Sequence, residues 1–165
     1  MKVVTLVRHA KSSWKDRTLP DHLRPLNKRG KRDAPMMGER LAERGVEVDQ
    51  MISSPATRAK TTAEAVAEEI GYPWEEIVVD ERLYHGEVFE LLQVIQGLED
   101  YVHHVMLFGH NPGLTELANY LSSYYINNVP TCGVVELRYD TDTWACPGEV
   151  EPTEVHFDYP KKRDT

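Results

Sequence analysis

Short apolar runs alternate with amphipathic segments along most of the chain, and this alternation limits the fold more than any other sequence feature. Four of the runs are short and rich in β-branched residues, as buried parallel strands are: residues 3–7, 48–52, 77–79 and 105–108. Segments with helical spacing separate these runs. Because strands that alternate with helices are joined by right-handed crossovers, the pattern predicts an α/β fold built in layers on parallel strands.

Four segments carry apolar residues at helical spacing on a single face: residues 27–44, 59–70, 88–95 and 114–121. In the second of these helices, Ser54 is expected to be the N-cap, Pro55 the first helical residue and Gly71 the stop signal. Gly45 is expected to end the first helix. Pro35 leaves the start or the straightness of that helix open.

The C-terminal part has a different pattern. Residues 134–139 and 154–159 are typical of a pair of edge strands that form a hairpin, with a Gly-, Pro- and Asp-rich connection between them. Residues 161–165 are expected to be a mobile tail. The 165-residue chain shows no linker and no internal repeat, which predicts a single domain over residues 1–160.

Charge and composition exclude several classes of protein. The chain has 19 Lys and Arg against 27 Asp and Glu, a net charge of −8, so its surface should repel nucleic acid and anionic membranes. It has no apolar run long enough to cross a membrane, and its N-terminal run is too short for a signal peptide, which predicts a cytoplasmic protein. Cys132 and Cys146 lack the spacing of a metal site and are expected to be reduced thiols.

The basic residues are concentrated near the N-terminus in spite of the acidic balance. They include Arg8, Lys11, Lys15, Arg17, Arg24, Lys28, Arg29, Lys31 and Arg32. An acidic protein with such a segment could hold a small anion there. The plainer interpretation is a charged face in contact with solvent.

Polar or ionisable residues follow each of the four expected strands. They are Arg8 and His9 after the first, Ser53, Ser54 and Arg58 after the second, Glu81 after the third, and His110 and Asn111 after the fourth. Ligands of open α/β sheets bind at the carboxyl ends of the strands, so this placement predicts a site for a small anion. Arginine forks bind phosphate oxygens, and the helix start expected at Ser54 adds free N–H groups.

Each of these residues alone has a plainer interpretation. Arg58 would be an exposed helical residue, His110 a loop histidine, and Glu81 a surface carboxylate paired with Arg82. The histidines outside the expected site show no ligand spacing, so no metal site is expected. The joint placement of His9, Arg58 and His110 at strand ends favours the anion site.

Four motifs occur in an order that resembles one known family. They are LVRHAKSSW at residues 6–14, LRPLNKRG at 23–30, SSPATRA at 53–59 and GHNPG at 109–113. They resemble the histidine phosphatase superfamily, in the variant seen in SixA-like phosphohistidine phosphatases, and span residues 3 to about 133. The resemblance implies a phosphoglycerate mutase-like fold: a three-layer α/β/α sandwich on a mixed, mostly parallel sheet with one antiparallel strand.

The resemblance also implies roles for five residues. His9 would be the nucleophile that accepts the phosphoryl group, and Arg8, Arg24, Arg58 and His110 would form the pocket that holds it, with no metal and no other cofactor. A neutral imidazole is a good nucleophile toward phosphorus, and nearby arginines should lower the pKa of His9. The same arginines would neutralise charge on the transferred phosphoryl oxygens, after which water would hydrolyse phospho-His9.

The chain departs from the wider superfamily at one catalytic position. Many members that cleave alkyl phosphates carry an Asp directly after the second histidine as general acid, where this chain has Asn111. Glu81 resembles the position at which mutase-like members place their acid, and it is the candidate here.

These features favour a phosphatase that acts on phosphohistidine in proteins, because an imidazole leaves more easily than an alkoxide when no acid is present. One alternative is a phosphomonoesterase or mutase that uses the same pocket on sugar or glycerate phosphates. A second is a non-catalytic module that binds phosphorylated ligands, in which an intact His9 would serve no purpose. The expected partner is a phosphorylated protein or small molecule, and the sequence leaves the substrate, the pathway and the oligomeric state open.

Overall fold

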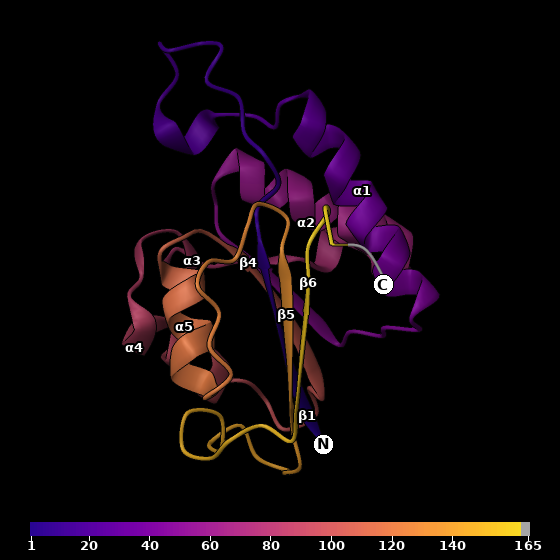
Figure 1. Ribbon diagram of the computed structural model, residues 1–165, viewed down its shortest axis with the longest axis vertical. Helices are drawn as coiled ribbons and strands as arrows, with labels where there is room; N and C mark the ends of the chain where they lie inside the picture. The colour runs from indigo at the N-terminus through magenta and orange to yellow at the C-terminus, as the bar shows by residue number, and fades with distance from the viewer. Residues whose placement is uncertain (163–165) are drawn as a thin grey trace.

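Six strands form one sheet between two layers of helices in the computed structural model, which describes residues 1–162 (Figure 1). They are β1 (Lys2–Arg8), β2 (Gln50–Ser53), β3 (Val78–Val79), β4 (His104–Gly109), β5 (Val134–Tyr139) and β6 (Glu154–Asp158), in the order β3-β2-β4-β1-β5-β6. β1 to β4 are parallel, whereas β5 is antiparallel to both of its neighbours, β1 and β6. The mixed, mostly parallel sheet of an α/β/α sandwich is therefore confirmed.

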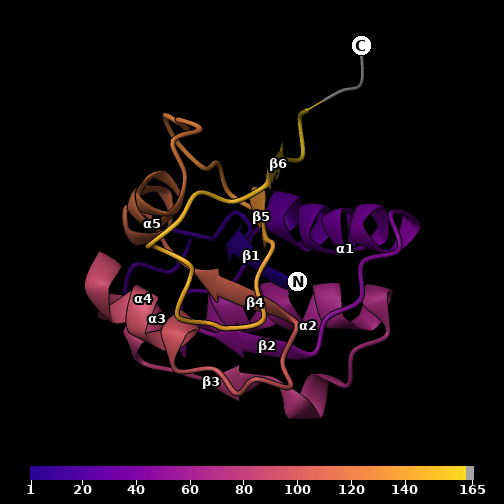
Figure 2. The same cartoon turned by 90° about the horizontal axis from the view of Figure 1, so that it is seen from below.

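The helices divide between the two faces of the sheet (Figure 2). α1 (Lys28–Glu43) and α2 (Thr57–Ile70) cover one face, α3 (Arg82–His85), α4 (Val88–Gln96) and α5 (Gly113–Leu121) cover the other, and the 3-10 turns η1 (Asp21–Leu23) and η2 (Trp74–Glu76) lie in connections. Each face has its own apolar core, with Met37 and Phe108 buried in the first and Leu6 and Leu117 in the second. Burying a side chain of this size contributes roughly 1.5–3 kcal/mol. Among the described residues, no helix is long and apolar enough to cross a membrane.

The first helix lies within the predicted range and ends before Gly45, as expected. The side chain of Asn27, the N-cap of α1, accepts a hydrogen bond from the Gly30 backbone N–H at 2.9 Å. The helix continues through Pro35, and Gly45 follows it with φ 74°. Gly71 ends α2 with φ 78°, as expected, because glycine adopts left-handed backbone angles without a steric penalty.

The start of α2 differs from the prediction. Ser54 and Pro55 lie before the helix, which begins at Thr57 with Ala56 as the N-cap. The Ser54 hydroxyl accepts a hydrogen bond from the Ala56 N–H at 3.1 Å and lies 2.8 Å from Nε2 of His110. The prediction of Ser54 as the N-cap is wrong because its side chain stabilises a turn before the helix and contacts a neighbouring strand end instead.

Two predicted positions in the sheet are also wrong. β3 was expected to be buried, but Val78 and Val79 are 45% and 49% exposed because this two-residue strand pairs with β2 at the edge. β5 and β6 form the predicted antiparallel hairpin, yet they are not both edge strands. β5 lies between β1 and β6 and is mostly buried, so only β6 forms that edge.

The predicted C-terminal tail is only partly described. The backbone N–H of Lys162 donates to the Tyr159 carbonyl at 2.9 Å, and its Nζ donates to the Phe157 carbonyl at 2.6 Å. Residues 163–165 of this predicted tail lie outside the described residues.

Candidate active site

The carboxyl ends of β1 and β4 bring the two predicted site histidines together. The strands pair so that Arg8 lies opposite Gly109, and the His9 backbone N–H donates to the Gly109 carbonyl at 3.0 Å. The ring centroids of His9 and His110 are consequently 5.0 Å apart. Arg58 joins them from the first turn of α2, which follows the adjacent strand β2.

His9 is held as a neutral ring with one free nitrogen. The side chain is buried, and its Nδ1 lies 2.7 Å from the Ala10 carbonyl, which can only accept, so Nδ1 carries the proton and Nε2 the lone pair. Burial is the main reason that the pKa of His9 is lowered to about 4. The hydrogen bond to Ala10 opposes this shift, and three guanidinium charges reinforce it, those of Arg58, Arg8 and Arg24. The imidazole is therefore unprotonated at neutral pH.

Unpartnered buried nitrogens surround this ring. Within residues 1–162, the buried side-chain N and O atoms without a hydrogen-bond partner are Arg8 Nε, Arg58 Nε and His110 Nδ1. Each of the two guanidinium groups is anchored by another nitrogen, since Arg8 Nη1 donates to the Val129 carbonyl at 3.0 Å and Arg58 Nη1 to the Asp21 carbonyl at 2.8 Å. A buried polar atom without a hydrogen-bond partner costs about 1–3 kcal/mol. Three such nitrogens, two of them on arginines, indicate a site for an anion.

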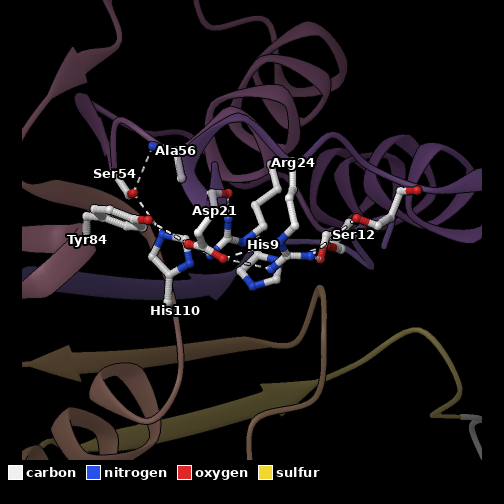
Figure 3. A network of polar contacts seen from close by, with 11 residues as sticks. His9, Ser12, Asp21, Arg24, Ser54, Ala56, Tyr84 and His110 are labelled. Atoms are coloured by element: carbon white, nitrogen blue, oxygen red, sulfur yellow. Dashed lines mark hydrogen bonds and ion pairs between the residues drawn. The ribbon is translucent and has the colours of Figure 1, made fainter. Parts of the chain in front are cut away.

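The ring of His110 is oriented by Ser54. The Ser54 hydroxyl accepts the Ala56 N–H and lies 2.8 Å from His110 Nε2 (Figure 3). When this hydroxyl donates its own proton to Nε2, the ring proton of His110 is on Nδ1. Burial, reinforced by the neighbouring charges of His9 and Arg58, lowers the pKa of His110 to about 3. In that tautomer, His110 is a neutral donor at Nδ1, the nitrogen that has no partner among the described residues.

Arg24 reaches the site from the long connection between β1 and α1. Its Nη1 donates to the Ser12 hydroxyl at 2.7 Å and to the Ser13 carbonyl at 3.4 Å. Its Cζ lies 3.6 Å from the ring centroid of Trp14, which is 66% exposed. Such a stack contributes about 0.5–1 kcal/mol and fixes the plane of the guanidinium group. The arginine predicted only from the resemblance is therefore buried beside the others.

Asp21 and Tyr84 line the mouth of the site, and the sequence analysis did not identify either. The Asp21 carboxylate accepts hydrogen bonds from Arg58 Nη2 at 3.0 Å, Arg24 Nε at 3.2 Å and the Tyr84 hydroxyl at 2.5 Å. The bond from Tyr84, followed by those from the arginines, holds the pKa of Asp21 well below its usual range. Its position three residues before Arg24 was a signal for this pairing, since Asp21 begins the turn η1 and Arg24 directly follows that turn.

Comparison with known proteins assigns this site to a family. The sequence profile of the histidine phosphatase superfamily (branch 1) matches residues 4–87, just over half of the chain. The chain belongs to this superfamily. An uncharacterized protein of Mycobacterium tuberculosis, Rv1276c, is 31% identical over 156 residues, which cover 88% of this chain and 92% of the relative.

Solved structures of the superfamily have the same fold. A SixA protein from Agrobacterium tumefaciens is 28% identical, with a TM-score of 0.75, over 84% of this chain and 92% of its own. The protein histidine phosphatase SixA, solved with tungstate, is 22% identical with a TM-score of 0.76, over 95% of this chain and 94% of its own. At that identity the second comparison supports the fold alone.

Asn111, at the position where some histidine phosphatases carry an acid, has a structural role here. Its Nδ2 donates to the Val129 carbonyl at 2.9 Å, the same carbonyl that accepts from Arg8, and its Oδ1 accepts from the Thr115 hydroxyl at 2.8 Å. The amide thus joins the start of α5 to the loop before β5. It has no acidic proton to give to a leaving group.

The structure places Glu81 at the surface. Its side chain is exposed, and the expected pairing with Arg82 is wrong, because both Nε and Nη2 of Arg82 donate to Asp80, at 3.0 and 2.7 Å. The side chain of this segment that reaches the site is Tyr84, whose ring centroid lies 5.2 Å from that of His110. A role for Glu81 as general acid stays a prediction.

The two cysteines are free, as predicted. Cys132 is buried directly behind the site, where its backbone N–H donates to the carbonyls of Arg8 and His9 at 3.1 and 3.0 Å. Burial raises the pKa of its thiol to about 12, so the thiol is neutral. In the part of the chain that the structure describes, no group of three or more His, Cys, Asp or Glu side chains could hold a metal ion.

Proposed function

We propose that this protein is a phosphatase in which His9 is the nucleophile and phosphohistidine on a protein is the substrate. The observation that carries the proposal is the set of three unpartnered buried nitrogens around a neutral imidazole with a free Nε2. Membership of the histidine phosphatase superfamily supports the same chemistry.

In the first step, the lone pair of His9 Nε2 attacks the phosphorus atom, and the bond between phosphorus and the leaving group breaks. Arg8 Nε, Arg58 Nε and His110 Nδ1 supply hydrogen bonds to the phosphoryl oxygens, on which negative charge is redistributed during transfer. In the second step, water attacks phospho-His9 and releases phosphate. Both steps depend on donors that are already oriented, which is why a rigid and buried site accelerates them.

The substrate follows from the chemistry of the leaving group. Asn111 cannot supply a proton, and the Glu81 side chain is exposed. A positioned general acid typically contributes about 10²–10⁴ in rate when an alkoxide leaves, and that contribution is absent without one. An imidazole whose second nitrogen is already protonated leaves as a neutral ring and needs no such acid. Phosphohistidine is accordingly the favoured substrate.

Trapping the intermediate tests the nucleophile. Enzyme quenched during turnover of ³²P-labelled substrate should retain label that is lost in acid and stable in base, as a phosphoramidate is, and the His9→Ala variant should retain none. The matched control is His22→Ala, which removes an exposed histidine of η1 and should be labelled like the wild type. Label on another residue type, or label that persists in His9→Ala, would contradict the proposal.

Comparing substrates tests the specificity. The ratio of kcat/KM for a phosphohistidine protein to that for glycerate and sugar phosphates should be large. Equal rates would favour the alternative of a small-molecule phosphatase or mutase. Tight phosphate binding without turnover of any of these substrates would favour a binding module.

A further inference from the structure

An acidic side chain lies at the mouth of a site that is otherwise built for an anion. The Asp21 carboxylate is paired with Arg24 at 3.2 Å and with Arg58 at 3.0 Å. The Asp21 side chain is 50% exposed, whereas the two arginine side chains are 8% and 7% exposed, so the carboxylate is on the solvent side of the guanidinium groups. Figure 3 shows Asp21 between Tyr84 and Arg24.

The Asp21 carboxylate changes the net charge of the site when a phosphoryl group is bound. Both site histidines are neutral at pH 7, so Arg8, Arg24 and Arg58 supply the positive charge of the site. A bound phosphoryl group with two negative charges neutralises two of these three guanidinium charges and leaves an excess of one. That excess would repel a leaving group that carries a positive charge, because unit charges a few ångströms apart interact by about 1 kcal/mol in water and by more near a protein surface. Asp21 cancels the excess.

We propose that Asp21 determines specificity, by favouring substrates in which the phosphoryl group is bonded to the nitrogen of a positively charged ring. This inference deepens the proposed function and rests on it, since it concerns the leaving group of the same reaction. The buried donors of the site would contact only the phosphoryl group, so they cannot distinguish one leaving group from another. The Asp21 carboxylate would provide the preference for a positively charged leaving group.

The atoms balance as follows for a phosphorylated imidazole. With its second nitrogen protonated, the ring is a cation, and the carboxylate stabilises this form. His9 Nε2 forms the new bond to phosphorus, the bond from phosphorus to the ring nitrogen breaks, and its electron pair stays on that nitrogen. The proton remains on the second nitrogen, and a neutral imidazole departs. An unprotonated ring would have to leave as an anion, which is much less favourable.

The groove next to the mouth is lined by acidic side chains and, like Asp21, would favour a positively charged group. It has a volume of about 280 Å³ and extends from Tyr84 and His110 along the start of α4 and α5. Its lining includes the carboxylates of Glu87 and Glu116 and contains no lysine or arginine. A cationic ring is therefore accommodated on this side better than a carboxylate-bearing group such as that of a glycerate phosphate.

The Asp21→Asn variant tests the inference, because it removes the negative charge and keeps one of the two oxygens that accept from the arginines. The probes are phosphoimidazole, whose ring can be protonated, and 4-nitrophenyl phosphate, whose leaving group is an anion. We expect kcat/KM for phosphoimidazole at pH 7 to fall roughly tenfold and that for the aryl phosphate to change less than about twofold. The rate with phosphoimidazole should also decline with rising pH at a lower pH than in the wild type, since the ring loses its proton more readily without the carboxylate.

Two further variants control for structural effects. Asp21→Glu keeps the charge and should retain most of the preference for phosphoimidazole. Asp16→Asn removes an exposed carboxylate of the same connection, one that bonds to Thr18, and should leave both rates unchanged. Equal losses for both substrates in Asp21→Asn would mean that Asp21 only positions the arginines, and equal gains would mean that it competes with the phosphoryl group. Either outcome overturns the inference.

Both probes are small, so this ratio is measurable whichever phosphorylated molecule the enzyme acts on. The proposed function fails if the wild type hydrolyses sugar phosphates as well as a phosphohistidine protein. The inference about Asp21 has a separate test. It fails if the preference for phosphoimidazole over 4-nitrophenyl phosphate is the same in Asp21→Asn as in the wild type.

Discussion

The floor of the site (Arg8, His9, Arg58 and His110) and its mouth (Asp21, Arg24, Tyr84 and Trp14) are formed in different ways. The floor residues lie at the ends of β1 and β4 and in the first turn of α2, where the pairing of strands fixes their positions. The mouth residues come from the connection after β1 and from the short helix α3. The sheet and the helix after β2 thus hold most of the groups that would meet the phosphoryl part of every substrate. The irregular segments add Arg24 to these groups and hold those that would meet the rest of the substrate.

Replacing a floor arginine should have the largest effect. Arg58→Ala removes an unpartnered buried donor, and turnover should fall by about 10²–10³ for every substrate, the usual cost of losing one preorganised donor. Tungstate should also inhibit this variant more weakly. Lys60→Ala, at an exposed position on the same helix, is the control and should have wild-type kinetics. A loss confined to one substrate class would show that Arg58 acts at the mouth instead.

The buried histidines of the floor should make the protein sensitive to acid. Because the pKa of His9 is about 4 in the folded state and about 6.5 when unfolded, the unfolded chain binds its proton at higher pH. The contribution of the His9 ring to the free energy of unfolding is therefore fully present above about pH 6.5. It decreases as the pH falls from there toward 4, by up to about 1.4 kcal/mol per pH unit. Urea unfolding at several pH values measures this slope. His9→Ala should have a shallower slope, and an identical slope would contradict the assignment.

A smaller effect on turnover is expected from replacing Ser54, which contacts a floor residue but does not itself belong to the floor. Ser54→Ala removes the hydroxyl that orients the His110 ring, so kcat should fall roughly tenfold with little change in KM, the scale of one neutral hydrogen bond. Ser53→Ala serves as the control, because the Ser53 hydroxyl is equally buried but bonds to the Ser54 carbonyl. Equal losses in the two variants would indicate a general packing effect and not orientation of His110.

The smallest effect is expected at Glu81, beyond the mouth. The Glu81→Gln variant should retain kcat within about twofold on phosphohistidine and alkyl phosphates, because the side chain is exposed. Steady-state kinetics with both substrates measures it. If Glu81→Gln hydrolyses alkyl phosphates at least tenfold more slowly and phosphohistidine at an unchanged rate, Glu81 is a general acid. It then has to be counted among the residues of the mouth.

The sequence predicted the floor because periodicity locates strand ends. His9, Arg58 and His110 each follow a short apolar run, and parallel pairing necessarily brings such positions together. The same reasoning could not place Asp21 or Tyr84, since no repeating pattern determines where an irregular connection folds back. Arg24 was identified only from the resemblance of its motif to a known family.

The errors in the predicted elements have a related cause. Local preference favoured a helix start at Ser54, but the contact of its hydroxyl with His110, a residue of another segment, decided the outcome. The burial of β3 was inferred from its apolar residues, although its place in the sheet order, at an edge, determines its exposure. The order of strands in the sheet and contacts between distant segments cannot be predicted from the apolar pattern of one short segment.

The hydrogen bond from Asn111 to the Val129 carbonyl limits how this enzyme could be re-engineered. Replacing Asn111 by Asp would supply the acid that alkyl phosphates require, but the new side chain, once ionised, could no longer donate to that carbonyl. Arg8 shares the carbonyl, so one of the arginines proposed to bind the phosphoryl group would be disturbed by the same substitution. Acquiring a new substrate class therefore requires coordinated changes in two segments of the chain, and a single substitution is a poor route between them.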